Sequence, residues 1–190
     1  MAIAAATVVE AIAIRRKQLF ILSMVGAVCL GTSQSVQAQC TAKNEAFQSG
    51  EHVMYDLYFN WKFIWKKVGL ASLTTNATTY HSEPAFRFNL LCVGSKKTDF
   101  FFKMRDTLTC YVSDRLEPLY FRKAAEEGSR HTVDEAWFSY SDGLANVKQR
   151  RTWHNPVREA QEMEYSDSRC IFDMLSILAQ ARSYDPKDYK

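Results

Sequence analysis

Hydrophobic and polar residues alternate along much of the chain after residue 50. In "EHVMYDLYFN" (51–60), the odd-numbered positions from 53 to 59 are all aliphatic or aromatic. Successive side chains of an extended strand point to opposite faces, so these positions share one face. The stretch "AFRFNLLCVGS" (85–95) alternates in the same way. Both stretches therefore predict β-strands with one apolar face.

Further stretches rich in β-branched or alternating residues predict the remaining strands. They cover 68–80, 106–113, 118–128, 131–143 and the return strand 144–154. Glu127-Gly128 and Asp142-Gly143 are turn signals between them. Six or seven short strands at this spacing indicate a mainly β fold, with one strongly curved antiparallel sheet or half-barrel.

One segment departs from the β pattern. In "SRCIFDMLSILAQARSYDP" (168–186), apolar residues recur at close to helical spacing, and Pro186 follows the pattern. Ser168 is a candidate N-cap, which would place Cys170 in the first turn. We expect one C-terminal amphipathic helix over 170–182, covering a face or an open end of the sheet. The segment "KTDFFFKM" (97–104) has no clean period and predicts a short helix or an irregular turn.

The N-terminal 38 residues have the pattern of a secretory signal peptide. A basic cluster at 15–17 precedes the apolar stretch 19–31, and Val36-Gln37-Ala38 is a small-x-small cleavage site. We expect cleavage after Ala38, export to the periplasm and a single mature domain over 39–190. An uncleaved membrane anchor is the alternative, although about 13 apolar residues fall short of the roughly 20 that span a bilayer.

The net charge argues against nucleic acid as a partner. The whole chain has 24 basic and 21 acidic residues. Removal of the leader takes away three basic residues and one acid, which leaves 21 and 20, a net charge of +1. Recognition of nucleic acid usually requires a clustered basic patch, which this balance does not favour. The mature chain is long enough for one ordinary domain with its own core.

Cysteine usage leaves the disulfide pattern open. The mature chain would contain Cys40, Cys92, Cys110 and Cys170. An oxidising compartment permits disulfides, and four cysteines allow three pairings. Cys92 and Cys110 lie on consecutive predicted strands, which makes their pairing the easiest. Free buried cysteines are the other interpretation.

The segment "NWKFIWKKVGLASL" (60–73) concentrates aromatic residues ahead of small ones. Trp61, Phe63 and Trp65 alternate and would share a face at the end of a strand. They form either the corner of the sheet's hydrophobic core or a ligand-binding platform, because aromatic side chains supply much of the contact area in concave sites. Gly69 and Ala71 would then allow another element to pack closely.

The sequence contains no recognised motif for catalysis, for a cofactor or for a metal. None of the four histidines stands at metal-ligand spacing, and nucleophile elbows, phosphate loops and HExxH are missing. His131 and Asp134 would point to opposite faces of their strand. If the protein is a hydrolase, Asp106, His131 and Cys110 are the best candidates for a constellation that forms only in space.

Several diffuse motifs resemble the DUF3108 family of exported bacterial proteins of unknown function. The matching stretches are "GEHVMYDLYFNW" (50–61), "VGLASL" (68–73), "RDTLTCYVSDRLEPLYFRKAAEEG" (105–128) and "FDMLSILAQAR" (172–182). Within them the matching residues are Gly50, Glu51, Tyr55, Trp61, Gly69, Ala71, Asp106, Asp114, Pro118, Gly128, Asp173, Ser176 and Arg182. The resemblance covers about 47–185.

The resemblance implies a curved antiparallel sheet with a helix, similar to the half-barrels of periplasmic lipoprotein carriers, and it supplies no catalytic residues. It also implies further strands after Lys190, so that this chain would be C-terminally truncated. Two functions from different classes follow as expectations, and a structural protein with no small ligand is a third option. One is a non-enzymatic periplasmic module that binds an apolar ligand or an envelope protein, and the other is an envelope hydrolase.

Overall fold

The computed structural model describes residues 41–190 except 98, 101, 185, 186 and 188–190, and at Trp61 it describes the backbone alone. The described residues belong to one compact unit, Gln37–Lys190. The predicted leader and Cys40 lie outside the described residues.

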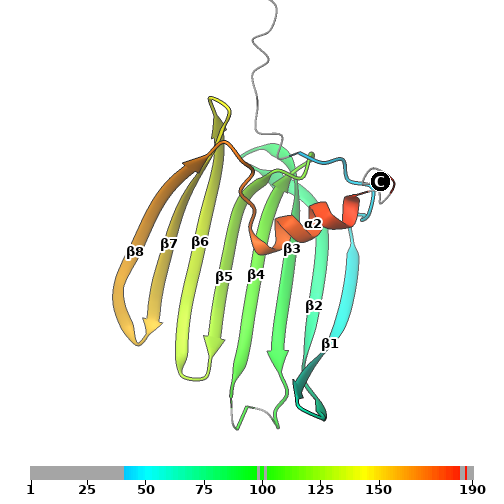
Figure 1. The fold of residues 1–190 in the computed structure, drawn as a ribbon, viewed down its shortest axis with the longest axis vertical. Helices are drawn as coiled ribbons and strands as arrows, with labels where there is room; N and C mark the ends of the chain where they lie inside the picture. The colour runs from blue at the N-terminus through cyan, green and yellow to red at the C-terminus, as the bar shows by residue number, and fades with distance from the viewer. Residues whose placement is uncertain (1–40, 98, 101, 185–186, 188–190) are drawn as a thin grey trace, which may run out of the picture. The chain divides into compact units, whose positions relative to one another are not determined.

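Eight antiparallel strands form a single sheet in chain order, from β1 at one edge to β8 at the other (Figure 1). The strands are β1 Glu51–Trp61, β2 Ile64–Tyr80, β3 Glu83–Gly94, β4 Met104–Ser113, β5 Pro118–Glu127, β6 Arg130–Ser141, β7 Leu144–Asn155 and β8 Val157–Asp167. One helix, α2 Met174–Ser183, follows them. The sheet is not closed, because β1 and β8 do not pair with each other. The predicted mainly β class is confirmed.

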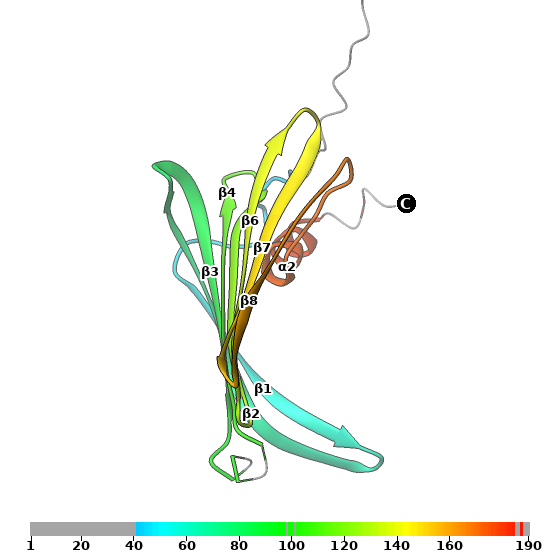
Figure 2. The same ribbon diagram turned by 90° about the vertical axis from the view of Figure 1, so that its left-hand side faces the viewer.

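The sheet is strongly twisted, as the edge-on view shows (Figure 2). The β1–β2 hairpin bends toward the side that carries α2, while the turn between β2 and β3 leans the other way. A bulge at Leu57/Tyr58 lies where β1 pairs with the small residues of β2. A Cβ atom at Gly69 would lie 2.4 Å from the carbonyl oxygen of Val93, so only glycine permits this approach of β3. The expected close packing at Gly69 is confirmed.

At most seven strands were predicted, one fewer than the eight in the structure, because β8 was missed. Most of its residues are exposed, and its sequence "VREAQEMEYSD" has no apolar alternation. An edge strand that is solvated on both faces needs no hydrophobic pattern to form, since its backbone pairs with β7. Both predicted glycine turns are confirmed, with positive φ angles at Gly128 and Gly143.

The hydrophobic core lies between α2 and the middle of the sheet. Leu175 and Ala179 of the helix pack with buried residues of β2, β3 and β4 and with the segment before β1. The core consists of Phe47, Leu73, Phe88, Leu108, Cys110, Val112, Leu116, Leu175 and Ala179. Phe47 meets the ring of Phe88 edge to face at 4.9 Å. The helix therefore packs over β2–β4. On the β5–β8 half of the same face Ala145 and Val147 are also buried, whereas Met163 is exposed.

The helix begins later than the sequence pattern predicted. Asp173 is its N-cap: its side chain accepts hydrogen bonds from the backbone N–H groups of Leu175 at 2.8 Å and Ser176 at 3.0 Å. The hydroxyl oxygen of Ser176 in turn accepts from the backbone N–H of Asp173, which completes a capping box. Ser168 is therefore not the cap, and Cys170 precedes the helix. Within the described part of the chain, no helix is long and apolar enough to cross a membrane.

An ion pair fastens the end of α2 to the start of β1. The guanidinium of Arg182 donates to both carboxylate oxygens of Glu51, at 2.9 and 2.6 Å. It also lies 5.7 Å from the ring of Phe47. Hydrogen bonding to Arg182 lowers the pKa of Glu51 below its ordinary value. This contact joins residues that are 131 positions apart in the sequence.

Candidate ligand-binding hollow

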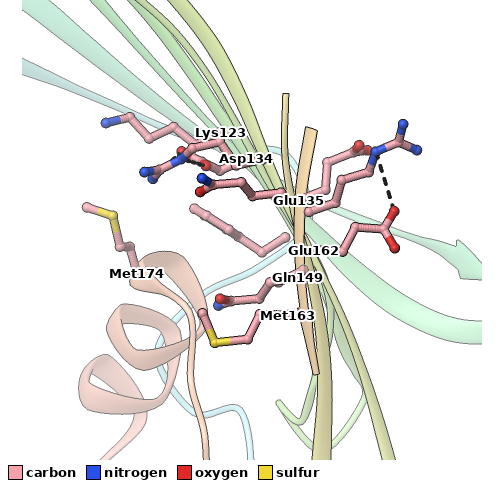
Figure 3. A pocket seen from close by; sticks show the side chains of 12 residues that line it. Lys123, Asp134, Glu135, Gln149, Glu162, Met163 and Met174 are labelled. Carbon is pink, nitrogen blue, oxygen red and sulfur yellow. Dashed lines mark hydrogen bonds and ion pairs between the residues drawn. The ribbon is translucent and has the colours of Figure 1, made fainter. Parts of the chain in front are cut away.

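A hollow of about 790 Å³ lies at the β5–β8 half of the sheet (Figure 3). Strands β5 to β8 form its floor, and Met174, at the start of α2, overhangs one side. Its lining comprises Phe121, Lys123, Asp134, Glu135, Ala136, Gln149, Arg150, Arg151, Gln161, Glu162, Met163 and Met174. The lining includes Glu135, Arg150 and Glu162 on the opposite face, so this volume spans both sides of the sheet near its β8 edge.

The strand register determines which of these side chains face the helix. Ala136 lies opposite Phe121 and Gln149, and Gln149 lies opposite Met163, so these positions share one face of the sheet. In Figure 3 Gln149 and Met163 point toward the side of Met174, whereas Glu135 and Glu162 point to the opposite side. Only the helix side is enclosed by a second element. We therefore place the candidate site there.

Apolar side chains form one part of the site. Phe121, Ala136, Met163 and Met174 converge from two strands, the edge strand and the helix. Met163 and Met174 are 60% and 63% exposed, so neither is held in the core. Methionine side chains are flexible and polarisable, which lets them adapt to apolar groups of different shape. The hollow can thus accommodate an apolar group without a rigidly matched shape.

Paired charges form the opposite rim. Arg151 donates to both carboxylate oxygens of Asp134, one at 3.1 Å. The ammonium of Lys123 lies 3.5 Å from a carboxylate oxygen of Glu127 and 3.9 Å from one of Asp106. Lys123 and Arg151 thus lie among three carboxylates, which belong to Asp106, Glu127 and Asp134. A ligand with both an apolar body and a polar head would meet complementary groups on both sides.

Asp106 is the least satisfied of these carboxylates. It is 8% exposed, and its Oδ1 atom has no hydrogen-bond partner among the described residues. Burial raises its pKa above the ordinary value, and Lys123 only partly offsets this. Cys92, which lies opposite Asp106 in the register, also has a raised pKa because of burial. On this face the carboxylate of Asp106 is therefore buried, whereas Arg151 and Lys123 form ion pairs at the rim of the hollow.

The candidate hydrolytic residues do not converge. Cys110 is fully buried in the core, where burial raises its pKa well above the ordinary value of a thiol. Asp106 shares the helix face with it, but His131 pairs with Glu126 on the other face. His131 packs against His154 there, with ring centroids 4.8 Å apart. The described residues also contain no group of three His, Cys, Asp or Glu side chains arranged to hold a metal ion.

The aromatic segment that was the predicted ligand platform lies elsewhere. Trp61 ends β1, Trp65 belongs to β2, and Phe63 lies in the tight turn between them, where Lys62 has a positive φ angle. The three residues therefore do not lie along one strand end, and Trp65 pairs with Asn60 while Trp61 pairs with Ile64. Phe63 is 97% exposed and Trp65 70% exposed. The prediction that this segment forms a corner of the core was wrong, and its ligand-binding role stays a prediction.

The suggested pairing of Cys92 with Cys110 was also wrong. Both are free thiols. Cys110 lies opposite Phe88, four residues from Cys92 along β3, which corresponds to about 13 Å along a strand. A disulfide requires Cα atoms less than about 7 Å apart. Cys170 is disulfide-bonded.

Sequence reasoning missed most of the hollow because its residues come from four strands and the helix. The predicted return strand 144–154 contains Arg150 and Arg151, but β8, which provides Met163, was not predicted. One signal was available in the sequence: Met163 is an isolated apolar residue in a charged segment. By itself it cannot indicate which neighbour it faces.

The whole-chain comparisons give one positive result. A family model described as "Protein of unknown function (DUF3108)" matches residues 54–189, more than half of the chain. Comparison with curated proteins and with solved structures gave no match.

Proposed function

Because the chain belongs to the DUF3108 family, whose function is unknown, we propose a function from the geometry of the sheet. The protein is an exported, non-enzymatic module of the cell envelope. It binds an amphipathic ligand, or an amphipathic segment of an envelope protein, in the hollow beside α2.

One observation carries the proposal: α2 fills only part of the concave face. Leu175 and Ala179 complete the core over β2–β4, whereas Met163 and Met174 remain exposed beside it. Exposed apolar side chains that converge in a concave site are typical of ligand-binding surfaces. The charged rim around Lys123 and Arg151 would hold the polar part of the ligand.

The export part of the proposal rests on the N-terminal sequence. The basic cluster, the apolar stretch and the small-x-small site indicate a cleaved leader and a periplasmic location. N-terminal sequencing of the protein from its own cells tests this directly. A mature chain that begins at Gln39 is the expected result, and a retained leader would contradict it.

Native mass spectrometry of protein purified from its own compartment tests the ligand. We expect an additional mass that is retained in the native state and lost on denaturation. Met163→Arg and Met174→Arg place a charge in the hollow and should remove that mass. The matched control is Met54→Arg, because Met54 is similarly exposed, at 54%, but lies on β1 away from the hollow. Protein that carries no ligand in any variant would contradict the proposal.

A further inference from the structure

The two ends of the sheet differ in chemistry. In an antiparallel meander successive turns lie at opposite ends of the sheet, so the β1–β2 and β3–β4 connections share one end with the short turns between β5 and β6 and between β7 and β8 (Figure 1). We call this the hairpin end and define it by residues 58–67 and 95–104. At the other end the turns are mostly polar, with the sequences "YHSE" (80–83), "SDRLE" (113–117) and "SDGL" (141–144). Leu116 in the second of these turns is fully buried.

Large apolar side chains project from the hairpin end. Phe63 and Trp65 are exposed at the first turn, together with Ile64. In the second connection Phe100 is 85% exposed, and Phe102 is also exposed. The two connections start side by side, since the backbone N–H of Ser95 donates to the carbonyl of Val68 at 2.7 Å, and the β1–β2 turn then bends toward the side of α2 (Figure 2). Exposed apolar groups collected at one end of a molecule mark an interaction surface.

Lysines accompany these aromatic residues. Residues 58–67 and 95–104 contain six lysines and one aspartate. Lys67 forms an ion pair with Asp56, and Lys103 forms one with Glu126. The aspartate, Asp99, is bound by Arg105. The hairpin end therefore keeps an excess of positive charge around its apolar tips.

This combination matches the chemistry of a bilayer surface. Aromatic side chains favour the layer of lipid headgroups, and lysines beside them are attracted to anionic lipids. The backbone of the first tip is paired across the hairpin, with Trp61 opposite Ile64, so few unsatisfied backbone groups would enter that layer. The two-residue β1–β2 turn also offers a tip that can enter lipid, whereas a stable protein interface usually requires a broad, continuous patch.

We propose that the hairpin end docks on the surface of an anionic lipid bilayer, with Phe63, Trp65 and Phe100 in the headgroup layer. The docking is interfacial and needs no membrane-spanning element. It is independent of the proposed ligand in the hollow. The two sites lie on different parts of the sheet, since the hollow is built from β5–β8 and α2.

Vesicle co-sedimentation tests the proposal. The sample is protein purified from its own cells, and its N-terminus is determined first. The wild type should bind vesicles of phosphatidylglycerol mixed with phosphatidylethanolamine, and bind phosphatidylcholine vesicles more weakly. Phe63→Ser with Trp65→Ser should weaken partition by at least about tenfold, because two aromatic side chains leave the interface. Lys62→Glu with Lys66→Glu should weaken binding to the anionic vesicles by about tenfold, and added salt should reduce this difference.

The matched control is Leu144→Ser with Ile177→Ser, which removes two exposed apolar side chains away from the hairpin end. This variant should bind vesicles as the wild type does, and circular dichroism should show that all variants are folded. Equal binding by the wild type and the Phe63/Trp65 variant would overturn the proposal. A wild-type protein that does not bind vesicles would also overturn the proposal. Crosslinking in cells would then identify an envelope protein at the hairpin end. Met163→Arg should leave vesicle binding intact, which separates this result from failure of the ligand proposal.

Discussion

At the scale of single residues, Asp106 shows how a strand separates adjacent charges. Arg105 and Asp106 are adjacent and oppositely charged in the sequence. The strand instead directs them to opposite faces. Arg105 binds Asp99 near the hairpin end, while Asp106 is buried beside Lys123. The sequence indicated the charge density correctly but could not show which partner each charge has.

Replacing Asp106 with Asn should stabilise the protein by about 1 kcal/mol at neutral pH, because a buried, incompletely paired charge is removed. Burial raises the pKa of Asp106 in the folded state, so the folded protein binds this proton more tightly than the unfolded chain. The advantage of the variant is therefore largest at neutral pH. It decreases as the pH falls through the raised pKa and vanishes below the ordinary value near 3.8.

Urea unfolding of both proteins at neutral and acidic pH measures this difference. Asp134→Asn provides a comparison, because Asp134 is bound by Arg151 at the rim of the hollow. That variant should lose stability or keep it unchanged. A loss of stability in Asp106→Asn at neutral pH would show that Asp106 is stabilised by its surroundings.

At the scale of elements, the strands with one buried face were predictable from the sequence, whereas the solvated edge strand was not. β4 alternates buried and half-buried residues along its whole length, so period-two patterning finds it. β8 has no such pattern, since its backbone pairs with β7 and its side chains meet β7 through polar and charged contacts rather than an apolar face. The helix was predicted in the right place. Its start was displaced because Ser168 and Asp173 are both acceptable caps, and only tertiary contacts select between them.

Replacing Arg182 with Ala should lower the free energy of unfolding by about 1 to 2 kcal/mol at neutral pH, because α2 loses its bidentate contact with β1. Glu51 has a lowered pKa in the folded state through its hydrogen bonds with Arg182. Its contribution is therefore present above the ordinary value near 4.5 and is lost as the pH falls through the lowered pKa. The difference between wild type and variant should shrink accordingly in acid.

Denaturant titrations across this pH range provide the measurement. Arg182→Lys retains the charge but not the forked geometry and should fall between the two proteins. Arg169→Ala is the control, because Arg169 is 86% exposed and its pair with Asp167 is a surface pair. An equal loss in the Arg169 and Arg182 variants would mean that the contact with Glu51 contributes nothing specific.

At the scale of the whole molecule, the sequence predicted an open curved sheet with a covering helix, and this is confirmed. The hollow was not predicted, because it depends on how far α2 extends over the sheet. Leu175 and Ala179 direct the helix to β2–β4, and with ten residues it does not extend to Met163 on β8. The aromatic tip was misassigned for a related reason: a turn at Phe63 interrupts what reads as a single alternating strand.

Hydrogen exchange should be uneven across the sheet. Amides of β3 and β4 should exchange most slowly, because these strands are paired on both sides and lie next to the core under α2. Amides of β8 and of the β1–β2 turn should exchange fastest. Mass spectrometry of peptic fragments after timed labelling measures the order. Protection of β8 equal to that of β4 would contradict this and indicate a partner on that edge.

The order of the strands has a consequence for how the chain folds as it is made. Each strand pairs with the one synthesised just before it, so hairpins can form one after another from the N-terminus without long loop closures. The core between the sheet and α2 stays open during this time, because the helix that covers it is made after all eight strands. Arg182 can reach Glu51 only after those strands have been synthesised. The sheet can thus form strand by strand, whereas the core closes in one step when α2 packs against it. A chain interrupted before Met174 would keep its hairpins and leave Phe88 and Leu108 exposed to water.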